Sequence, residues 1–157
     1  MKLSNFLNKN NITFDIKPDE KYKLLDKLID FLITSNKLKN KEEIKKAIIK
    51  REHLETTAIG RGIAIPHAKI KDIKSTFVAC AIIKEGVDFK SLDNKPVDLF
   101  FIIISCASDP DAHIKALSKL AGILNDKELC EKIRESSTSS DVLKIIKKHE
   151  RGLSWKL

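Results

Sequence analysis

The segment 51–69, REHLETTAIGRGIAIPHAK, holds the residues of this chain with the clearest chemical potential. It begins with Arg51, continues through Thr56 and Thr57, and reaches His67 near its end. A neutral imidazole nitrogen can act near pH 7 both as a nucleophile and as a leaving group. An arginine fork can hold two oxygens of one phosphoryl group. The segment therefore predicts a site that could hold a phosphate.

The local sequence around His67 predicts how the ring is presented. Residues 62–65 should form a short extended segment, and Pro66 should end it because proline has no N–H for a ladder. His67 is therefore expected just beyond a strand end, with its ring near the surface. The glycines at 60 and 62 would let backbone N–H groups approach an anion closely. Taken alone, a turn histidine more often has no chemical role, so the wider pattern decides the case.

That wider pattern resembles the active-site signature of the fructose/mannitol-type enzyme IIA domains of the bacterial sugar phosphotransferase system, a family that includes the nitrogen-regulatory enzyme IIA proteins. The signature places an acidic or amide residue ahead of an aliphatic-Ala-aliphatic-Pro-His run. Its fixed positions are all filled here, by Glu52, Ile59, Gly60, Ile63, Ala64, Ile65, Pro66, His67 and Ala68. The stretch GVDFKSLDNKPVDL at 86–99 and the segment around His113 also look like this family, so the resemblance covers nearly the whole chain.

The resemblance implies a role for several residues. In this family the signature histidine accepts a phosphoryl group from the phosphocarrier HPr and passes it to a cysteine of an enzyme IIB domain, which assigns these steps to His67. It places Arg51 and His113 near the phosphorylated ring, Arg51 to hold oxygens and His113 to donate one N–H while neutral. Thr56 and Thr57 are candidates for hydroxyl contacts with the phosphate. No cofactor is implied.

Two features leave the biological partner open. A nitrogen-regulatory enzyme IIA would use the same phosphohistidine to bind or release regulatory proteins instead of feeding a transporter, and no residue separates the two roles. Arg61 stands where a small, polar or acidic residue is expected, so it puts an extra positive charge beside the segment. The sequence does not name the sugar.

Other kinds of site fit the sequence less well. A zinc ion bound by His53, His67 and His113 is conceivable, because zinc accepts three imidazoles and an open position, but no His-x-x-x-His pair is present. His53 and His149 have no counterpart role in the family. The chain has no P-loop and no dinucleotide fingerprint, so neither ATP nor NAD is implied. We therefore expect no metal.

The net charge of +8 raises the possibility of a nucleic-acid-binding protein. The lysines are spread over nearly every expected element, however, and the sequence has four arginines, one Trp and one Tyr, too few for base reading or stacking. A solvated lysine-rich surface explains the charge better. We expect no nucleic-acid partner.

Length and composition predict one domain spanning residues 1–157 and a cytoplasmic protein. The chain is 42% hydrophobic and 33% charged, and it has no apolar run long enough to insert in a membrane. The N-terminus lacks the apolar core of a signal peptide. The cysteines, Cys80, Cys106 and Cys130, are odd in number and widely spaced, so they should be free thiols.

The hydrophobic pattern predicts an α/β fold. Residues 76–83 and 97–105 are continuous apolar runs, as in strands covered by helices on both faces. A short half-buried strand is expected at 11–16, and a helix should follow with Pro18 in its first turn. A second helix should begin with a capping box of Asn40 and Glu43 and finish near Glu55.

The C-terminal half should supply three further helices. One begins at 108–111 and buries a stripe of Ile114, Leu117, Ala121 and Leu124, with His113 partly buried at its border. Helices should follow at 126–133 and from 138, and the tail after His149 should be frayed. Together these elements predict a three-layer α/β/α domain around a mixed β-sheet.

Overall fold

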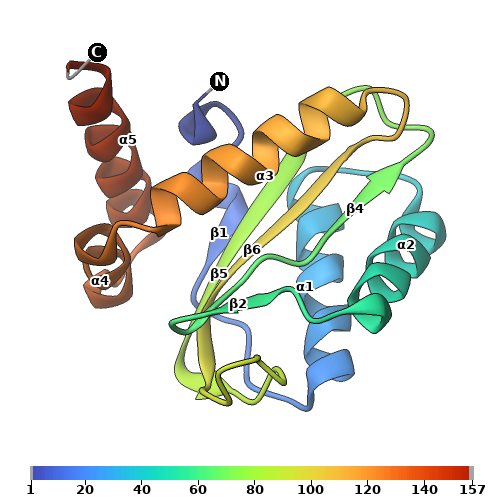
Figure 1. The fold of residues 1–157 in the computed structure, drawn as a ribbon, viewed down its shortest axis with the longest axis horizontal. Coiled ribbons are helices and arrows are strands. Elements are labelled where there is room, and N and C mark those ends of the chain that lie inside the picture. Colours follow the sequence, from blue (N-terminus) through green and yellow to red (C-terminus); the bar gives the residue numbers. More distant parts are fainter. Residues whose placement is uncertain (1, 156–157) are drawn as a thin grey trace.

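The computed structural model of the protein describes residues 2–155, and a mixed β-sheet runs through its centre (Figure 1). The strands follow the order β1-β5-β6-β3-β2, and β4 pairs with β6 beyond the end of β3. The pair β5 and β6 is antiparallel, whereas β1 runs parallel to β5, and both β3 and β4 run parallel to β6. The strands are β1 (Ile12–Thr13), β2 (Ala58–Gly60), β3 (Ile63–Ala64), β4 (His67–Ile70), β5 (Phe77–Val87) and β6 (Val97–Cys106).

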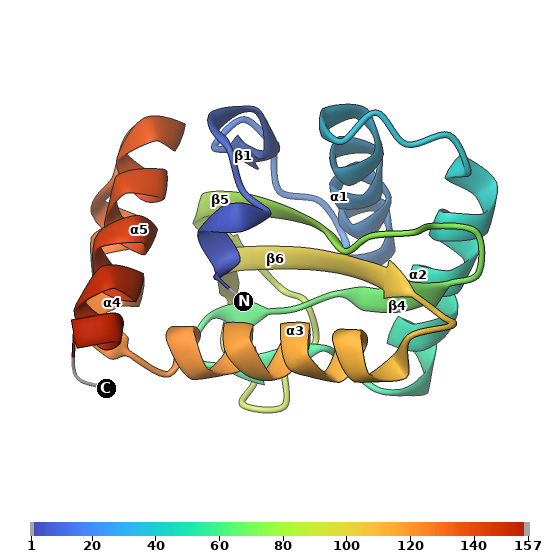
Figure 2. The same cartoon turned by 90° about the horizontal axis from the view of Figure 1, so that it is seen from above.

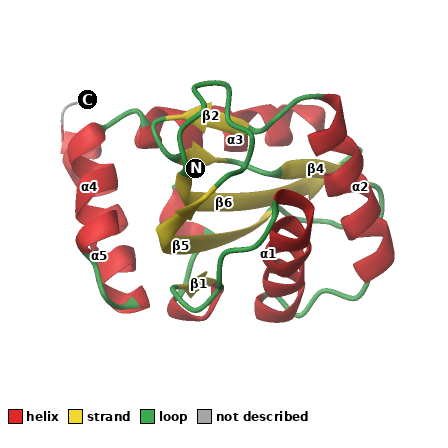
Figure 3. Cartoon of the chain, turned by 90° about the horizontal axis from the view of Figure 1, so that it is seen from below, coloured by secondary structure: helices red, strands yellow, loops and turns green. Residues whose placement is uncertain are grey.

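Helices cover both faces of this sheet, which confirms the expected α/β/α layers around a mixed sheet. Figure 2 shows the long strands between α3 on one side and α1 on the other. Figure 3 shows α4 and α5 together at one end of the molecule and α2 at the opposite end. The helices are α1 (Lys21–Ser35), α2 (Lys41–Leu54), α3 (Pro110–Leu124), α4 (Lys127–Glu135) and α5 (Ser139–Trp155), preceded by short 3₁₀ turns at Leu3–Asn5 and Lys9–Asn11.

The continuous apolar runs of β5 and β6 form the centre of two cores. Successive side chains of a strand point to opposite faces, so Phe100, Ile102 and Ile104 pack with α1 and α2, while Leu99, Phe101 and Ile103 pack with α3, α4 and α5. Burying each large apolar side chain contributes roughly 1.5–3 kcal/mol. Neither face of these strands could be left in water, which is why the sequence specifies helices on both.

The N-terminal elements differ in detail from the sequence-based expectation. The expected strand at 11–16 is reduced to Ile12–Thr13. Pro18 lies before α1 rather than in its first turn, because Glu20 caps the helix and accepts a hydrogen bond from the Lys23 N–H at 2.7 Å. The capping box expected at Asn40 is absent, since its backbone is not extended and its side chain makes no capping hydrogen bond.

The C-terminal helices show two further differences. Ile114 is 61% exposed, because α3 turns His113, Ala116 and Leu120 inward in its place. Residues 150–155, where the sequence suggested a frayed tail, continue α5. Glu150 is buried and accepts hydrogen bonds from the N–H groups of Leu3 and Ser4, at 2.6 Å and 3.0 Å. Residues 156–157 lie outside the described residues.

Two smaller findings complete the description of residues 2–155. None of its helices combines the length and the apolar composition needed to cross a bilayer. Cys80 and Cys130 are buried and Cys106 is partly exposed, and all three are free thiols.

Candidate functional site

His67 is the first residue of a strand, not a residue beyond one as the sequence suggested. Pro66 does end β3, but the chain stays extended and rejoins β6, where Ile103 N–H donates to Pro66 O at 3.0 Å. His67 is paired in register with Ile103, whose side chain faces α3. The His67 ring is therefore half-buried on the α3 face of the sheet, where a rigid strand fixes its backbone.

A hydrogen bond to its own backbone orients the His67 ring. Nδ1 lies 2.7 Å from Ile65 O, and a carbonyl oxygen only accepts, so Nδ1 carries the hydrogen and Nε2 carries the lone pair. Burial lowers the pKa of His67, and the nearby Arg51 guanidinium lowers it further, against the opposing effects of the Ile65 bond and Glu52. The ring is therefore neutral at pH 7, with Nε2 as its nucleophilic atom.

His113 lies beside this ring, as the family resemblance implied. The two ring centroids are 5.6 Å apart and tilted at 46°, and His113 comes from the first turn of α3. The side chain is more buried than the sequence suggested, with 7% of the residue exposed. Burial, with smaller contributions from His67 and Lys69, lowers the pKa of His113 to about 4. His113 is therefore a neutral neighbour that can donate one N–H.

The buried neutral state of His113 predicts a pH dependence of stability. Between pH 6.5 and about 4 the unfolded chain binds a proton at this position and the folded chain does not, so the free energy of unfolding should fall as the pH falls through this window. The loss should be on the order of 2 kcal/mol. Urea unfolding across this range checks it, with His113→Gln as the comparison. Equal losses in both proteins would contradict the assignment to His113.

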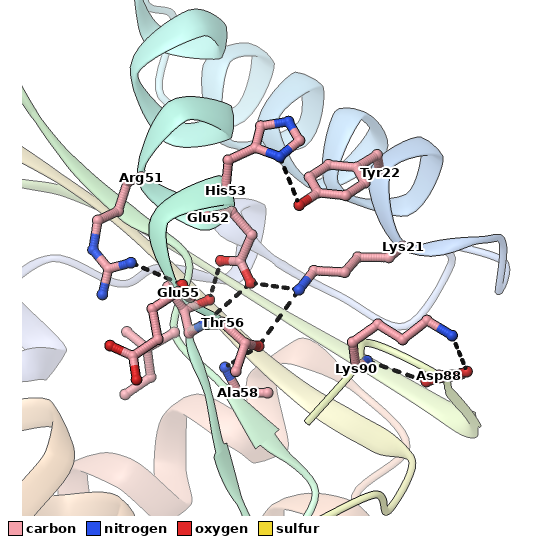
Figure 4. Close-up of polar contacts among 12 residues, drawn as sticks. Lys21, Tyr22, Arg51, Glu52, His53, Glu55, Thr56, Ala58, Asp88 and Lys90 are labelled. Atoms are coloured by element: carbon pink, nitrogen blue, oxygen red, sulfur yellow. Dashed lines mark hydrogen bonds and ion pairs between the residues drawn. The ribbon is translucent and has the colours of Figure 1, made fainter. Parts of the chain in front are cut away.

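Arg51 approaches the site from the last turn of α2 (Figure 4). Its Nη1–H donates to Glu55 O at 2.9 Å, which uses one of the five N–H donors of the guanidinium. Its charge acts on His67, because it contributes to the lowered pKa of that ring. The structure therefore places the rings of His67 and His113 side by side, from β4 and α3, and puts the charge of Arg51 on α2 near enough to lower the pKa of His67.

The two threonines have different surroundings. The Thr57 hydroxyl donates to Glu52 Oε2 at 2.5 Å, and Thr57 is buried. Thr56 is half-buried, and its hydroxyl oxygen accepts from the Ala58 N–H at 3.2 Å. Thr56 is therefore the better placed of the two for a contact with a bound oxyanion.

Two residues at the site received no role from the sequence. Glu52 was recognised only as a signature position, yet its carboxylate is fully buried and accepts hydrogen bonds from Thr57. Lys21 reaches it from α1 with Nζ at 3.0 Å from Oε1. A lysine in the first turn of an amphipathic helix carries no sequence signal for such a contact.

The turn at residues 60–62 does not lie beside His67, contrary to expectation. It joins β2 to β3, and Gly62 O accepts from the Asp98 N–H at 3.0 Å. Asp98 is five residues before Ile103, the partner of His67, which is roughly 17 Å along the strand. Gly62 has φ 78°, and a Cβ there would come within 2.9 Å of Arg134 Nη2. These glycines serve the hairpin rather than an anion.

Arg61 belongs to the same hairpin, so its charge lies away from the histidine pair. Its N–H donates to Asp93 Oδ2 at 3.1 Å, and its carbonyl accepts from Arg134 Nη2 at 2.7 Å. Arg134 Nε in turn lies 3.0 Å from both oxygens of Asp98. A second ion pair thus holds this turn, and Arg61 itself is exposed.

The remaining histidines lie elsewhere. The His53 ring stacks on Tyr22 with centroids 4.5 Å apart, and its Nδ1 lies 3.2 Å from the tyrosine hydroxyl (Figure 4). His149 Nδ1 lies 3.4 Å from Asp126 Oδ2. Across the part of the chain that the structure describes, no three His, Cys, Asp or Glu side chains gather in an arrangement that could hold a metal ion.

Known proteins resemble this chain in sequence and in fold. The family model described as "Phosphoenolpyruvate-dependent sugar phosphotransferase system, EIIA 2" matches residues 5–149. The fructose-specific EIIABC component of Bacillus subtilis (strain 168) is 34% identical over 151 residues, which are 96% of this chain and 24% of that protein. The chain thus spans about a quarter of the length of that relative.

Nitrogen regulatory proteins resemble the chain to a similar degree in sequence identity. A nitrogen regulatory protein of Bradyrhizobium diazoefficiens is 33% identical over 107 residues, which are 68% of this chain and 70% of that protein. The crystal structure of the nitrogen regulatory protein IIA-Ntr from Neisseria meningitidis matches with a TM-score of 0.83 and 28% identity, covering 92% of this chain and 98% of that one. The family match over 5–149 decides the classification: the chain belongs to the type 2 enzyme IIA family of the phosphoenolpyruvate-dependent sugar phosphotransferase system.

Proposed function

We propose that the protein is a cytoplasmic phosphoryl carrier that takes a phosphoryl group from HPr onto His67 and passes it to the cysteine of an enzyme IIB domain that serves a fructose-type sugar. The observation that carries the proposal is the orientation of the His67 ring, whose Nδ1–H is held by Ile65 O at 2.7 Å and whose Nε2 is left as the nucleophile. The fructose assignment draws support from the fructose-specific relative.

The proposed transfer needs few steps. His67 Nε2 attacks the phosphorus of phospho-HPr, and the bond from phosphorus to the donor nitrogen breaks. The IIB thiolate then attacks the same phosphorus, and Nε2 leaves with its lone pair. Phosphoryl transfer depends mainly on positioning and on donors around the moving oxygens, and Arg51 and a neutral His113 supply such donors.

Labelling the protein tests this proposal. Incubation with phosphoenolpyruvate, enzyme I and HPr should attach one phosphate per chain, and the bond should be labile in acid and stable in base, as for a phosphoramidate. Omitting HPr should prevent labelling at matched enzyme I. An acid-stable phosphate, as on serine or threonine, would refute the proposal.

A nitrogen-regulatory role is the second candidate, and the relatives with that name favour it. The two roles differ after His67 is phosphorylated. A transport component should lose its label to a IIB cysteine, and the correct sugar should drain the label further. A regulator should keep its label in that assay and bind another protein in only one phosphorylation state, because a new dianion beside Arg51 changes the local charge. Retention of label with every IIB domain of the cell would favour the regulator.

Exposed apolar side chains that are close in sequence to the site residues predict where a protein partner docks. Leu54 is 77% exposed three residues after Arg51, and Ile114 is 61% exposed directly after His113. Changing either to Asp should raise the KM for phospho-HPr by roughly 10-fold, because a charge would be desolvated at the interface. Leu92, 75% exposed on the loop between β5 and β6, is the matched control, and Leu92→Asp should leave the KM unchanged. A KM unchanged in all three variants would rule out this docking surface.

A further inference from the structure

We propose that Glu52, whose buried carboxylate is neutralised by an ion pair with Lys21, is a positioning residue that holds both His67 and Arg51 through the turn at residues 55–57. Neither Glu52 nor Lys21 touches the reacting atoms in this account. The kinetic part of the inference rests on the proposed function, whereas its structural part concerns the ring of His67 and stands without it.

The first step is that Glu52 fixes the turn. Its side chain is 0% exposed, and it accepts hydrogen bonds from both the N–H and the hydroxyl of Thr57, at 3.0 Å and 2.5 Å. Two hydrogen bonds from one residue to the two oxygens of one carboxylate leave that residue little freedom to rotate. The chain after α2 is therefore tied back onto the last turn of the helix.

The second step is that the positive charge of Lys21 offsets part of the cost of burying the Glu52 carboxylate. Its Nζ lies 3.0 Å from Glu52 Oε1 and 3.5 Å from Thr56 Oγ1 (Figure 4). The same atom lies 4.7 Å from the centre of the buried Phe89 ring. Taking two charges out of water carries a large desolvation cost, so a buried ion pair is weak evidence for a gain in stability. The ion pair contacts two successive residues of the turn, Thr56 through Lys21 and Thr57 through Glu52, and these contacts indicate positioning instead.

The third step is that hydrogen bonds connect this turn to the nucleophile, His67. Thr57 O accepts from the Ile65 N–H at 3.0 Å, and Ile65 O accepts from His67 Nδ1–H at 2.7 Å. The carboxylate of Glu52 is thus connected to the His67 ring by three consecutive hydrogen bonds through two residues. If Thr57 moves, the Ile65 peptide loses its anchor, and the acceptor that fixes the imidazole tautomer moves with it.

The fourth step is that a hydrogen bond connects the same turn to Arg51. Arg51 Nη1–H donates to Glu55 O at 2.9 Å, and Glu55 lies between the end of α2 and the residues that Glu52 and Lys21 hold. The direction of the guanidinium therefore depends on the same turn. One buried carboxylate, with its lysine partner, thus sets the geometry of two of the groups that the proposed transfer uses, His67 and Arg51.

Paired substitutions test the inference without leaving an unpaired buried charge. Lys21→Met with Glu52→Leu removes the pair and its bonds to Thr57 at similar volume. Lys21→Met with Glu52→Gln removes both charges but keeps an acceptor oxygen for Thr57, so it is the conservative rescue. Asp98→Asn with Arg134→Met is the matched control, because it removes the ion pair that holds the distant turn at 60–62.

Two measurements are made on each protein. Nitrogen NMR of the neutral His67 imidazole reports which ring nitrogen carries the hydrogen and needs no partner. The rate of labelling from phospho-HPr reports transfer. The Leu variant should show a mixture of the two tautomers and at least ~10-fold slower labelling, since small misplacements of reacting groups cost rate. The Gln variant should recover the Nδ1–H tautomer and most of the rate, and the control should match wild type in both.

The outcomes separate the inference from the proposed function. Absence of labelling in wild type would refute the proposed function, and the tautomer measurement would still decide the inference. A Leu variant with the wild-type tautomer and rate would show that the ion pair is merely structural. A Gln variant as impaired as the Leu variant would also overturn the inference, because the bonds to Thr57 would then be irrelevant. If the Leu variant does not fold, Thr57→Val, which removes only the hydroxyl bond to Glu52, must show the mixed tautomers for the inference to hold.

Discussion

His67→Ala should reduce phosphorylation by phospho-HPr to background, at least ~10³-fold below wild type, because the substitution removes the only proposed nucleophile. His113 should not replace it, since its ring is almost fully buried and comes from a different element. The variant should remain folded, because the His67 side chain makes one hydrogen bond and lies only partly in the core. Radiolabel incorporation measures the effect.

A histidine outside the site provides the control for this experiment. His53→Ala removes an exposed ring that stacks on Tyr22 and should label at the wild-type rate. Full labelling of His67→Ala would assign the phosphate to another residue, and tandem mass spectrometry under neutral conditions would identify which one.

Arg51→Ala should slow the transfer by about 10²-fold, because it removes a preorganised donor from a site where charge moves. Arg51→Lys should recover part of the rate, since it restores the charge but not the planar fork that can hold two oxygens. Stability should change by only about 1 kcal/mol, because the hydrogen bond lost is the single bond to Glu55 O on a half-exposed side chain. Single-turnover transfer from phospho-HPr, with urea unfolding of the same samples, measures both effects.

A different result would change the role of Arg51. If Arg51→Ala transfers as fast as wild type while its unfolding midpoint drops, the residue caps the end of α2 and takes no part in transfer. Lys50, exposed one residue earlier on the same helix, supplies the charge-matched control through Lys50→Ala.

The parts of the fold that the sequence predicted well are those with a strong local signal. The apolar runs of β5 and β6 are long enough to stand out, and Asp109 followed by Pro110 marks the start of α3. By contrast, β2 and β4 are three and four residues long, and their pairing with β3 and β6 is a long-range event that no local pattern encodes. Ile114 shows the same limit, because the sequence pattern placed Ile114 in the buried stripe and His113 at its border, and packing against the sheet turns His113 inward instead.

The sequence likewise predicted some residues of the candidate site and missed others. His67, His113 and Arg51 were named because together they match a family pattern; the structure places the two histidine rings side by side and the Arg51 charge near enough to lower the pKa of His67. Lys21 was not named, since it meets Glu52 across 31 positions of the chain and a lysine there looks like any solvated lysine. The prediction that the glycines at 60 and 62 lie beside an anion was wrong, because glycine with positive φ occurs both in anion-binding loops and in hairpin turns.

In the proposed transfer, the bond between His67 Nδ1 and the Ile65 carbonyl also decides the order in which the donor and acceptor proteins can bind. With one ring nitrogen occupied by the backbone and the ring unable to swing, donor and acceptor must present their reactive atoms to the same nitrogen from the same direction. The donor and the acceptor therefore cannot bind at the same time. We therefore expect ping-pong kinetics, with unphosphorylated donor competing against the acceptor, so that throughput peaks at an intermediate donor concentration and declines when the donor is in excess.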